Sequence, residues 1–205
     1  MHSSLGIPMR SDERNRREVV GSGASAAAVA LAAAAGPAVL RAAGALAKGA
    51  DQPAIVASML AAEQTAAVAY GAAAAAGLLT KPLTDVARLF HDQAEAHAGA
   101  LAPELRALGG KPPRRRRPED VKGLAGLRSE AEFIAFAIQL ENAAVRRHVE
   151  ALQVLQTPKL LGTVARIMAS CGQHLVILRQ ELSADPADWV PDAFETGSSP
   201  APAET

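Results

Sequence analysis

The fold of this chain is constrained most strongly by four segments of more than twenty residues. Each segment begins with a helix-start signal and ends with a helix-stop signal. Each opens on a residue that caps helix N-termini well, and each closes at glycine or proline. The capping residues are Asp51, Thr80, Ser129 and Thr157. Ser129 also has Glu132 three residues later, the pattern of a capping box. The segments therefore predict four long helices.

The composition agrees with an all-α fold. Hydrophobic residues make up 49% of the chain but aromatic residues only 3%, and alanine supplies almost half of the apolar side chains. Alanine loses no side-chain entropy in a helix and so favours helix over sheet. The links before Thr80 and Thr157 are short, whereas residues 109–128 form a long link between the second and third helices. We therefore predict a four-helix bundle with one long crossover.

The crossover contains a basic run, Arg114 to Arg117, flanked by prolines. The chain as a whole has 21 basic and 21 acidic side chains, so its net charge does not indicate a nucleic-acid-binding protein. We interpret the run as an extended, solvated connector and expect no nucleic-acid partner. A role of the run in binding acidic lipid or nucleic acid is the alternative.

Residues 1–47 form a separate predicted unit. Arg16 and Arg17 precede Glu18 and two valines, and an apolar stretch rich in alanine follows. This layout is typical of a twin-arginine export signal, with cleavage expected after Ala47. The alternative is an N-terminal helix in which residues 21–47 anchor the protein in a membrane. We thus expect a bundle over residues 48–185 that is extracytoplasmic or in the cell envelope, and a C-terminal tail over residues 186–205.

Each predicted helix carries a side chain near its middle that can ligate a metal ion. These residues have apolar neighbours on the same helix face, so they are expected to point into the bundle. A buried carboxylate needs a partner, because an unpaired charge in an apolar interior is very unfavourable. The four candidate metal ligands are Glu63, His97, Glu141 and His174.

Three other polar residues share these faces. Tyr70 follows Glu63 by seven residues and His148 follows Glu141 by seven, so each returns to the face of its glutamate. We interpret His148 as a core histidine with a local partner. Cys171 is the only cysteine, which excludes an internal disulfide and any multi-cysteine metal site. Buried free cysteine usually packs as a small hydrophobe.

Residues 51–183 resemble the ferritin-like four-helix bundles of actinobacteria, particularly the exported groups. The resemblance rests on the mid-helix residues above, on "LGGKPP" after the second helix and on "WVPDAFETG" near the C-terminus. It implies a di-iron centre in which the first and third helices each give a Glu, here Glu63 and Glu141. The second and fourth helices each give a Glu and, three residues later, a His, here His97 and His174.

This chain departs from that pattern at two positions. Ala94 and Cys171 stand where the resemblance places carboxylates, and Glu95 is rotated by about 100° from the required position. Two carboxylates are too few to neutralise and bridge two divalent ions. We therefore do not expect a di-iron ferroxidase.

Two interpretations remain for the four candidates. In the first, they bind one iron, manganese or zinc ion, and Cys171 or water completes the shell. In the second, no metal binds, each Glu accepts a hydrogen bond from a His, and the protein is a structural or binding module of the cell envelope, with homo-oligomerisation possible. We do not expect an enzyme. If there is an activity, metal-dependent oxidation and reduction is the class that these residues allow.

Overall fold

The structure is a computed structural model that describes residues 51–191 and 196–197. The predicted export segment, residues 1–47, and most of the predicted tail lie outside the described residues. The described residues contain four long helices: α3 (Gln52–Ala76), α4 (Lys81–Ala107), α5 (Glu130–Val154) and α6 (Pro158–Gln180). Three short elements accompany them: the 3-10 helices η1 (Pro118–Asp120) and η2 (Leu124–Gly126), and the one-turn helix α7 (Pro186–Trp189).

The predicted helix boundaries agree with those observed, and the capping contacts agree in part. Asp51 Oδ1 accepts a hydrogen bond from the Ala54 N–H at 3.0 Å, and Ser129 Oγ accepts one from the Glu132 N–H at 3.2 Å. The predicted capping box is only half formed, because the Glu132 carboxylate accepts from the Arg128 N–H at 2.6 Å, one residue before the cap. Thr80 and Thr157 stand at the N-cap positions of α4 and α6 without a side-chain cap bond. A proline in the first turn of each helix removes one of the N–H groups that need a cap.

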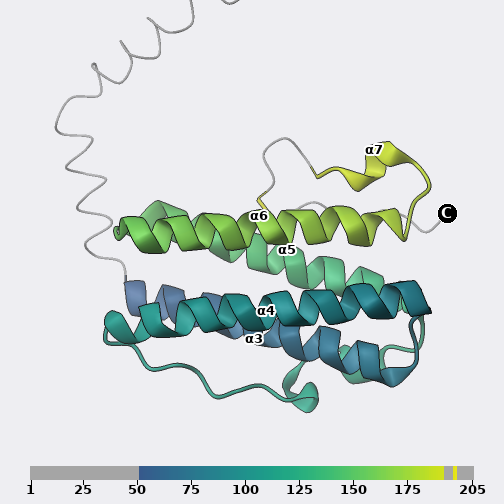
Figure 1. The fold of residues 1–205 in the computed structure, drawn as a ribbon, viewed down its shortest axis with the longest axis horizontal. Coiled ribbons are helices and arrows are strands. Elements are labelled where there is room, and N and C mark those ends of the chain that lie inside the picture. Colours follow the sequence, from purple (N-terminus) through teal and green to yellow (C-terminus); the bar gives the residue numbers. More distant parts are fainter. Residues whose placement is uncertain (1–50, 192–195, 198–205) are drawn as a thin grey trace, which may run out of the picture. The chain divides into compact units, whose positions relative to one another are not determined.

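The four long helices pack as two hairpins (Figure 1). α3 packs along α4 and α5 along α6, and the two hairpins meet through contacts of α3 with α5 and of α4 with α6. Residues 108–129 cross between the hairpins and contain η1 and η2. The all-α four-helix bundle with a long link between its second and third helices is therefore confirmed.

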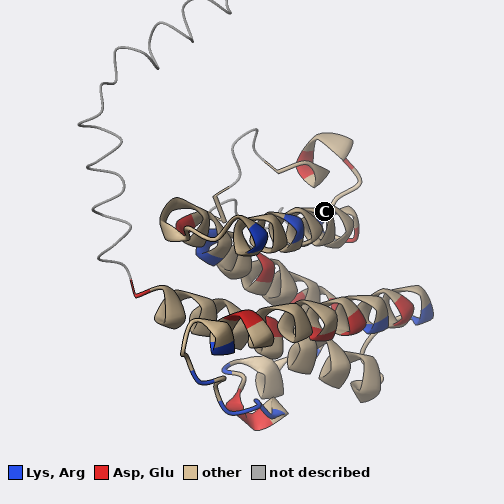
Figure 2. Ribbon diagram, turned by 60° about the vertical axis from the view of Figure 1, so that its left-hand side comes forward, with Lys and Arg blue, Asp and Glu red and all other residues tan. Residues whose placement is uncertain are grey.

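The basic run is largely paired within the chain, as Figure 2 shows where blue and red segments meet on the crossover. Arg114 lies 2.8 Å from Asp120, Arg115 lies 2.6 Å from Glu95, and Arg117 lies 3.7 Å from Glu119. The four arginines are solvent exposed and belong to no regular element. Exposed ion pairs of this kind contribute little to the stability of a fold. The arrangement is what a solvated connector requires.

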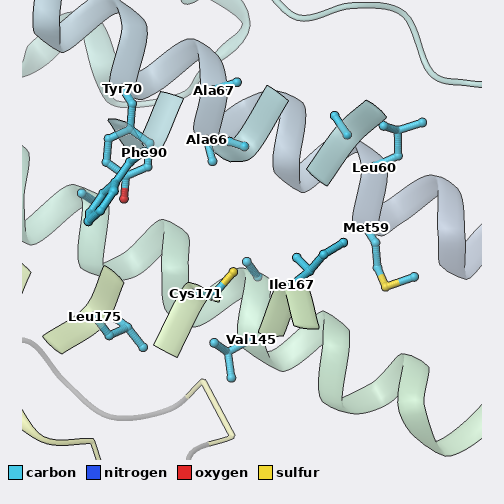
Figure 3. Close-up of a cluster of buried hydrophobic side chains, with 14 of the residues drawn as sticks. Met59, Leu60, Ala66, Ala67, Tyr70, Phe90, Val145, Ile167, Cys171 and Leu175 are labelled. Atoms are coloured by element: carbon cyan, nitrogen blue, oxygen red, sulfur yellow. The ribbon is translucent and has the colours of Figure 1, made fainter. Parts of the chain in front are cut away.

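Alanine and aliphatic side chains fill most of the interior (Figure 3). Its bulkiest part is an aromatic cluster in which Tyr70 meets Phe90 and Phe133 edge to face, with ring centroids 5.4 and 6.0 Å away. Aromatic pairs at this distance and angle contribute beyond the area they bury. The cluster holds the Tyr70 ring against α4 and α5, so the position of its hydroxyl group is determined by packing.

The residues after α6 return to the bundle at two points. Trp189 Nε1 donates a hydrogen bond to the Ser183 carbonyl at 2.7 Å, and α7 contacts α6. Gly197 is buried with φ 81°, and a Cβ atom there would lie 2.1 Å from the carbonyl oxygen of Asn142 on α5. Only glycine permits both the positive φ and this close approach.

Candidate metal centre

Each long helix delivers polar side chains to the interior of the bundle. Glu63 comes from α3, Glu141 and His148 from α5, and His174 from α6, and all four are at most 4% exposed. His97, from α4, has a side chain that is 16% exposed. The apolar residues that flank each of them hold these side chains on inward faces. The bundle therefore contains two buried carboxylates and two almost fully buried imidazoles.

The seven-residue spacings on α3 and α5 produce reciprocal contacts between these two helices. Tyr70 Oη donates a hydrogen bond to Glu141 Oε1 at 2.7 Å, while Glu63 Oε1 lies 3.6 Å from His148 Nε2. Seven residues rise about 10.5 Å along a helix, so the two contacts lie at different heights in the bundle. We call them the Glu141 level and the Glu63 level.

At the Glu141 level the polar atoms are well paired. His174 Nδ1 lies 3.0 Å from Glu141 Oε1, and His174 Nε2 lies 2.6 Å from Gln93 Oε1. Phe90 stacks on the His174 ring with centroids 3.8 Å apart. Both ring nitrogens of His174 are thus engaged and the ring is held in place. Glu141 accepts two hydrogen bonds, from Tyr70 and from His174.

At the Glu63 level, one of the two carboxylate oxygens of Glu63 lacks a hydrogen-bond partner. Glu63 Oε2 accepts a hydrogen bond from His97 Nδ1 at 3.0 Å. Glu63 Oε1 is buried and has no hydrogen-bond partner, and the same is true of His148 Nε2, which faces it. Their separation of 3.6 Å is too long for a hydrogen bond.

The protonation state of His148 follows from its other nitrogen. Nδ1 lies 2.6 Å from the Ala144 carbonyl oxygen, which only accepts, so Nδ1 carries the hydrogen. Burial lowers the pKa of His148 and outweighs the attraction of Glu63. The ring is therefore neutral, and Nε2 presents a lone pair. Two atoms with lone pairs, His148 Nε2 and Glu63 Oε1, therefore face each other in the buried interior.

Cys171 from α6 completes a group of three ligand atoms. Its sulfur, a Glu63 oxygen and a His148 nitrogen all lie within 4.8 Å of one another, and all three residues are buried. Figure 3 shows the Cys171 side chain directed into the bundle. Burial, followed by the nearby carboxylates of Glu141 and Glu63, raises the pKa of the thiol well above its ordinary value. Without a cation in the group, Cys171 is a thiol.

The four candidates from the sequence thus lie in two Glu–His pairs, Glu63 with His97 and Glu141 with His174. The three-residue group found among the described residues shares only Glu63 with that set. From the sequence, His148 is predicted to be a core residue, whereas Cys171 is predicted either to pack in the core or to complete the metal shell. The seven-residue repeat from Glu141 to His148 placed His148 on the right face, but nothing in the sequence showed that it would meet Glu63.

Residues 51–184 match the family model of the ferritin-like domain. The chain belongs to the ferritin-like domain family. Neither the curated proteins nor the solved structures contain a significant match to it. The family and the bundle agree with the fold expected from the sequence.

The residues of this ferritin-like domain fit one metal ion better than two. A two-metal centre of the type implied by the resemblance needs carboxylates at positions 94 and 171, and Ala94 and Cys171 are both buried there. A single ion requires fewer negative charges. It would also give the unpaired Glu63 Oε1 and His148 Nε2 a common partner.

The metal-free domain should lose stability as the pH rises above about 9. The pKa values of buried Tyr70 and Cys171 are raised above 10.0 and 9.0, chiefly by desolvation, so the folded state keeps protons that the unfolded state releases. The contribution of these protons is complete below about pH 9 and is lost as the pH increases. Denaturant unfolding between about pH 8 and 10.5, with chelator present, measures it. In the double variant Cys171→Ala/Tyr70→Phe, the free energy of unfolding should fall less steeply with pH. If it falls as steeply as in the native chain, these two groups are not the cause.

Proposed function

We propose that this protein is an exported ferritin-like protein with an eroded metal centre, which binds one divalent transition metal ion inside the bundle. The observation that carries the proposal is that Glu63 Oε1 and His148 Nε2 are buried, face each other and both lack a hydrogen-bond partner. Leaving one buried polar atom without a partner costs about 1–3 kcal/mol. One cation between the two atoms removes both penalties.

Glu63 is the central ligand in this proposal, and His148 supplies the first imidazole. The ligand set expected from the sequence, Glu63 with His97, Glu141 and His174, requires more rearrangement. His174 would have to leave Glu141 or Gln93, and His97 Nδ1 already bonds Glu63. The hydrogen bond from His97 to Glu63 Oε2 instead suits a residue that orients a ligand.

The proposal does not include catalysis. Redox turnover also requires an ion that changes its oxidation state, and a group of three ligands does not by itself select such an ion. The bound ion would supply a fixed positive charge that links α3 to α5. Iron, manganese and zinc are the ions that we propose for this group. We propose no nucleic-acid partner.

Export is the second part of the proposal and rests on residues 1–47, with Arg16 and Arg17 ahead of an apolar stretch. We expect the mature protein outside the cytoplasm to begin at Lys48, which N-terminal sequencing would show. A product in the membrane fraction that retains residues 21–47 would support the membrane-anchored alternative instead.

Metal analysis of the protein purified without chelator tests the first part. We expect about one equivalent of a transition metal in the native chain, and loss of this metal in Glu63→Ala and in His148→Ala. His97→Ala should retain part of it, because His97 contacts Glu63 but not the unpaired oxygen. His91→Ala is the matched control, since His91 lies outside the group and bonds the Ala67 carbonyl.

A metal-free helical module is the second candidate function. It is favoured by the two Glu–His hydrogen bonds, which already give each carboxylate a partner. In that case the native chain would contain no metal, would take up none when ions are added, and would melt at the same temperature with and without chelator. This result would overturn the metal proposal.

A further inference from the structure

The position of Cys171 bears on which ion the bundle would select. Its sulfur lies within 4.8 Å of ligand atoms from Glu63 and His148, so three helices contribute to one small volume. Cys171 is 2% exposed. Two of the three residues also have a buried atom without a hydrogen-bond partner.

We propose that Cys171 is a metal ligand, and that with Glu63 and His148 it forms a site for one thiophilic, four-coordinate ion of the zinc class. The inference rests on the proposed function and adds the identity of the third ligand and of the ion. Zinc binds Cys sulfur at about 2.3 Å and His nitrogen and carboxylate oxygen at about 2.0–2.2 Å. Tetrahedral donors at these lengths lie roughly 3.3–3.8 Å apart, so closure of the group needs only small side-chain shifts.

Charge balance supports a divalent ion at this position. A Glu63 carboxylate and a Cys171 thiolate carry two negative charges, and a neutral His148 adds none. One divalent ion makes the group neutral, which is the condition for burying charges in an apolar interior. On binding, the S–H bond of Cys171 breaks, the sulfur electron pair forms the bond to the ion, and the proton leaves to solvent. No electron is transferred.

The partners around the three ligands have the arrangement that metal-binding side chains usually show. His148 Nδ1 bonds the Ala144 carbonyl at 2.6 Å, which leaves Nε2 toward the ion. His97 Nδ1 holds the second oxygen of Glu63 at 3.0 Å, which leaves Oε1 toward the ion. Contacts of this kind fix the tautomer and orientation of a ligand.

The thiolate sulfur of Cys171 would determine which metal ions the site binds most tightly. Thiolate ligands select zinc and related ions, whereas magnesium, calcium and manganese prefer sites made of oxygen. We therefore expect zinc and cobalt(II) to bind far more tightly than manganese(II) or magnesium. On this proposal, the Cys171 thiolate is a metal ligand at the position where the resemblance places a carboxylate ligand.

Cobalt(II) titration of the chelator-treated full chain tests the inference, because a cobalt–thiolate bond gives a charge-transfer absorption in the near ultraviolet. We expect this band to saturate at one equivalent of cobalt(II) and to disappear when one equivalent of zinc is added. Cys171→Ser should abolish the band and weaken zinc binding at least tenfold. His91→Gln, outside the group, should match the native chain. Circular dichroism confirms that each variant is folded, and Cys171→Ala provides a second substitution if serine disturbs the core.

The outcomes separate this inference from the proposed function. Binding of one ion that depends on Glu63 but gives no thiolate band, with unchanged affinity in Cys171→Ser, would overturn the inference and leave the proposed function in place. A preference for manganese(II) over zinc would do the same. No binding of any ion by the native chain would overturn both.

Discussion

Replacing Glu141 by alanine should lower the free energy of unfolding of the metal-free domain by about 1–3 kcal/mol for each of the two buried hydrogen-bond donors that it leaves without an acceptor. Glu141 is 3% exposed and accepts hydrogen bonds from Tyr70 Oη at 2.7 Å and His174 Nδ1 at 3.0 Å. Both donors are buried and lose their acceptor in the variant. Denaturant unfolding at neutral pH with chelator present measures the change.

Two matched variants show whether the loss comes from the hydrogen bonds. Glu141→Gln keeps an acceptor oxygen and should cost clearly less than Glu141→Ala. Glu95→Ala removes an exposed partner of Arg115, for which we expect less than about 1 kcal/mol. If Glu141→Ala unfolds at the same denaturant concentration as the native chain, Glu141 is not held in the network described above.

Zinc at about one hundred times its dissociation constant should raise the free energy of unfolding by about 2.7 kcal/mol. An ion that binds the folded chain and not the unfolded chain stabilises by mass action, and the ligand group exists only when α3, α5 and α6 are packed. Thermal unfolding over a series of free zinc concentrations measures the effect. The melting temperature should continue to rise with the logarithm of zinc concentration above the dissociation constant.

Glu63→Gln is the decisive variant for this prediction, because it keeps the shape of the side chain and removes the charge. Its melting temperature should not depend on zinc, whereas that of His91→Gln should follow the native chain. Equal stabilisation of Glu63→Gln and the native chain would place the zinc on the surface and contradict the site.

Much of the fold could be predicted from the sequence because the signals are local. Asp51 and Ser129 cap helices as expected, and Gly77 ends the first helix with φ 71°. The capping box shows the limit of such reasoning. Ser129 and Glu132 have the right spacing, yet the Glu132 carboxylate bonds the preceding residue, Arg128. Which of two adjacent N–H groups a flexible side chain reaches depends on the path of the incoming chain.

For the candidate site, the sequence could predict which helix faces carry the polar residues but not which of these residues contact each other. The sequence placed Glu63 and Glu141 in the interior, and both are buried. It also showed that His148 returns to the face of Glu141 after seven residues. It did not show that His148 would lie 3.6 Å from Glu63, or that Nδ1 would be held by the Ala144 carbonyl.

The sequence by itself determined the helices, their order, the long crossover and the inward direction of the acids and histidines, because helix periodicity and capping act over a few residues. The tertiary structure alone decided which polar side chains meet. A residue rises only about 1.5 Å along a helix, so a small axial shift of α3 against α5 would pair Glu63 with a different residue. Side-chain packing between helices sets that shift, and it depends on residues far apart in the chain. The same packing brings the Cys171 thiol to an imidazole and a carboxylate oxygen that lack hydrogen-bond partners.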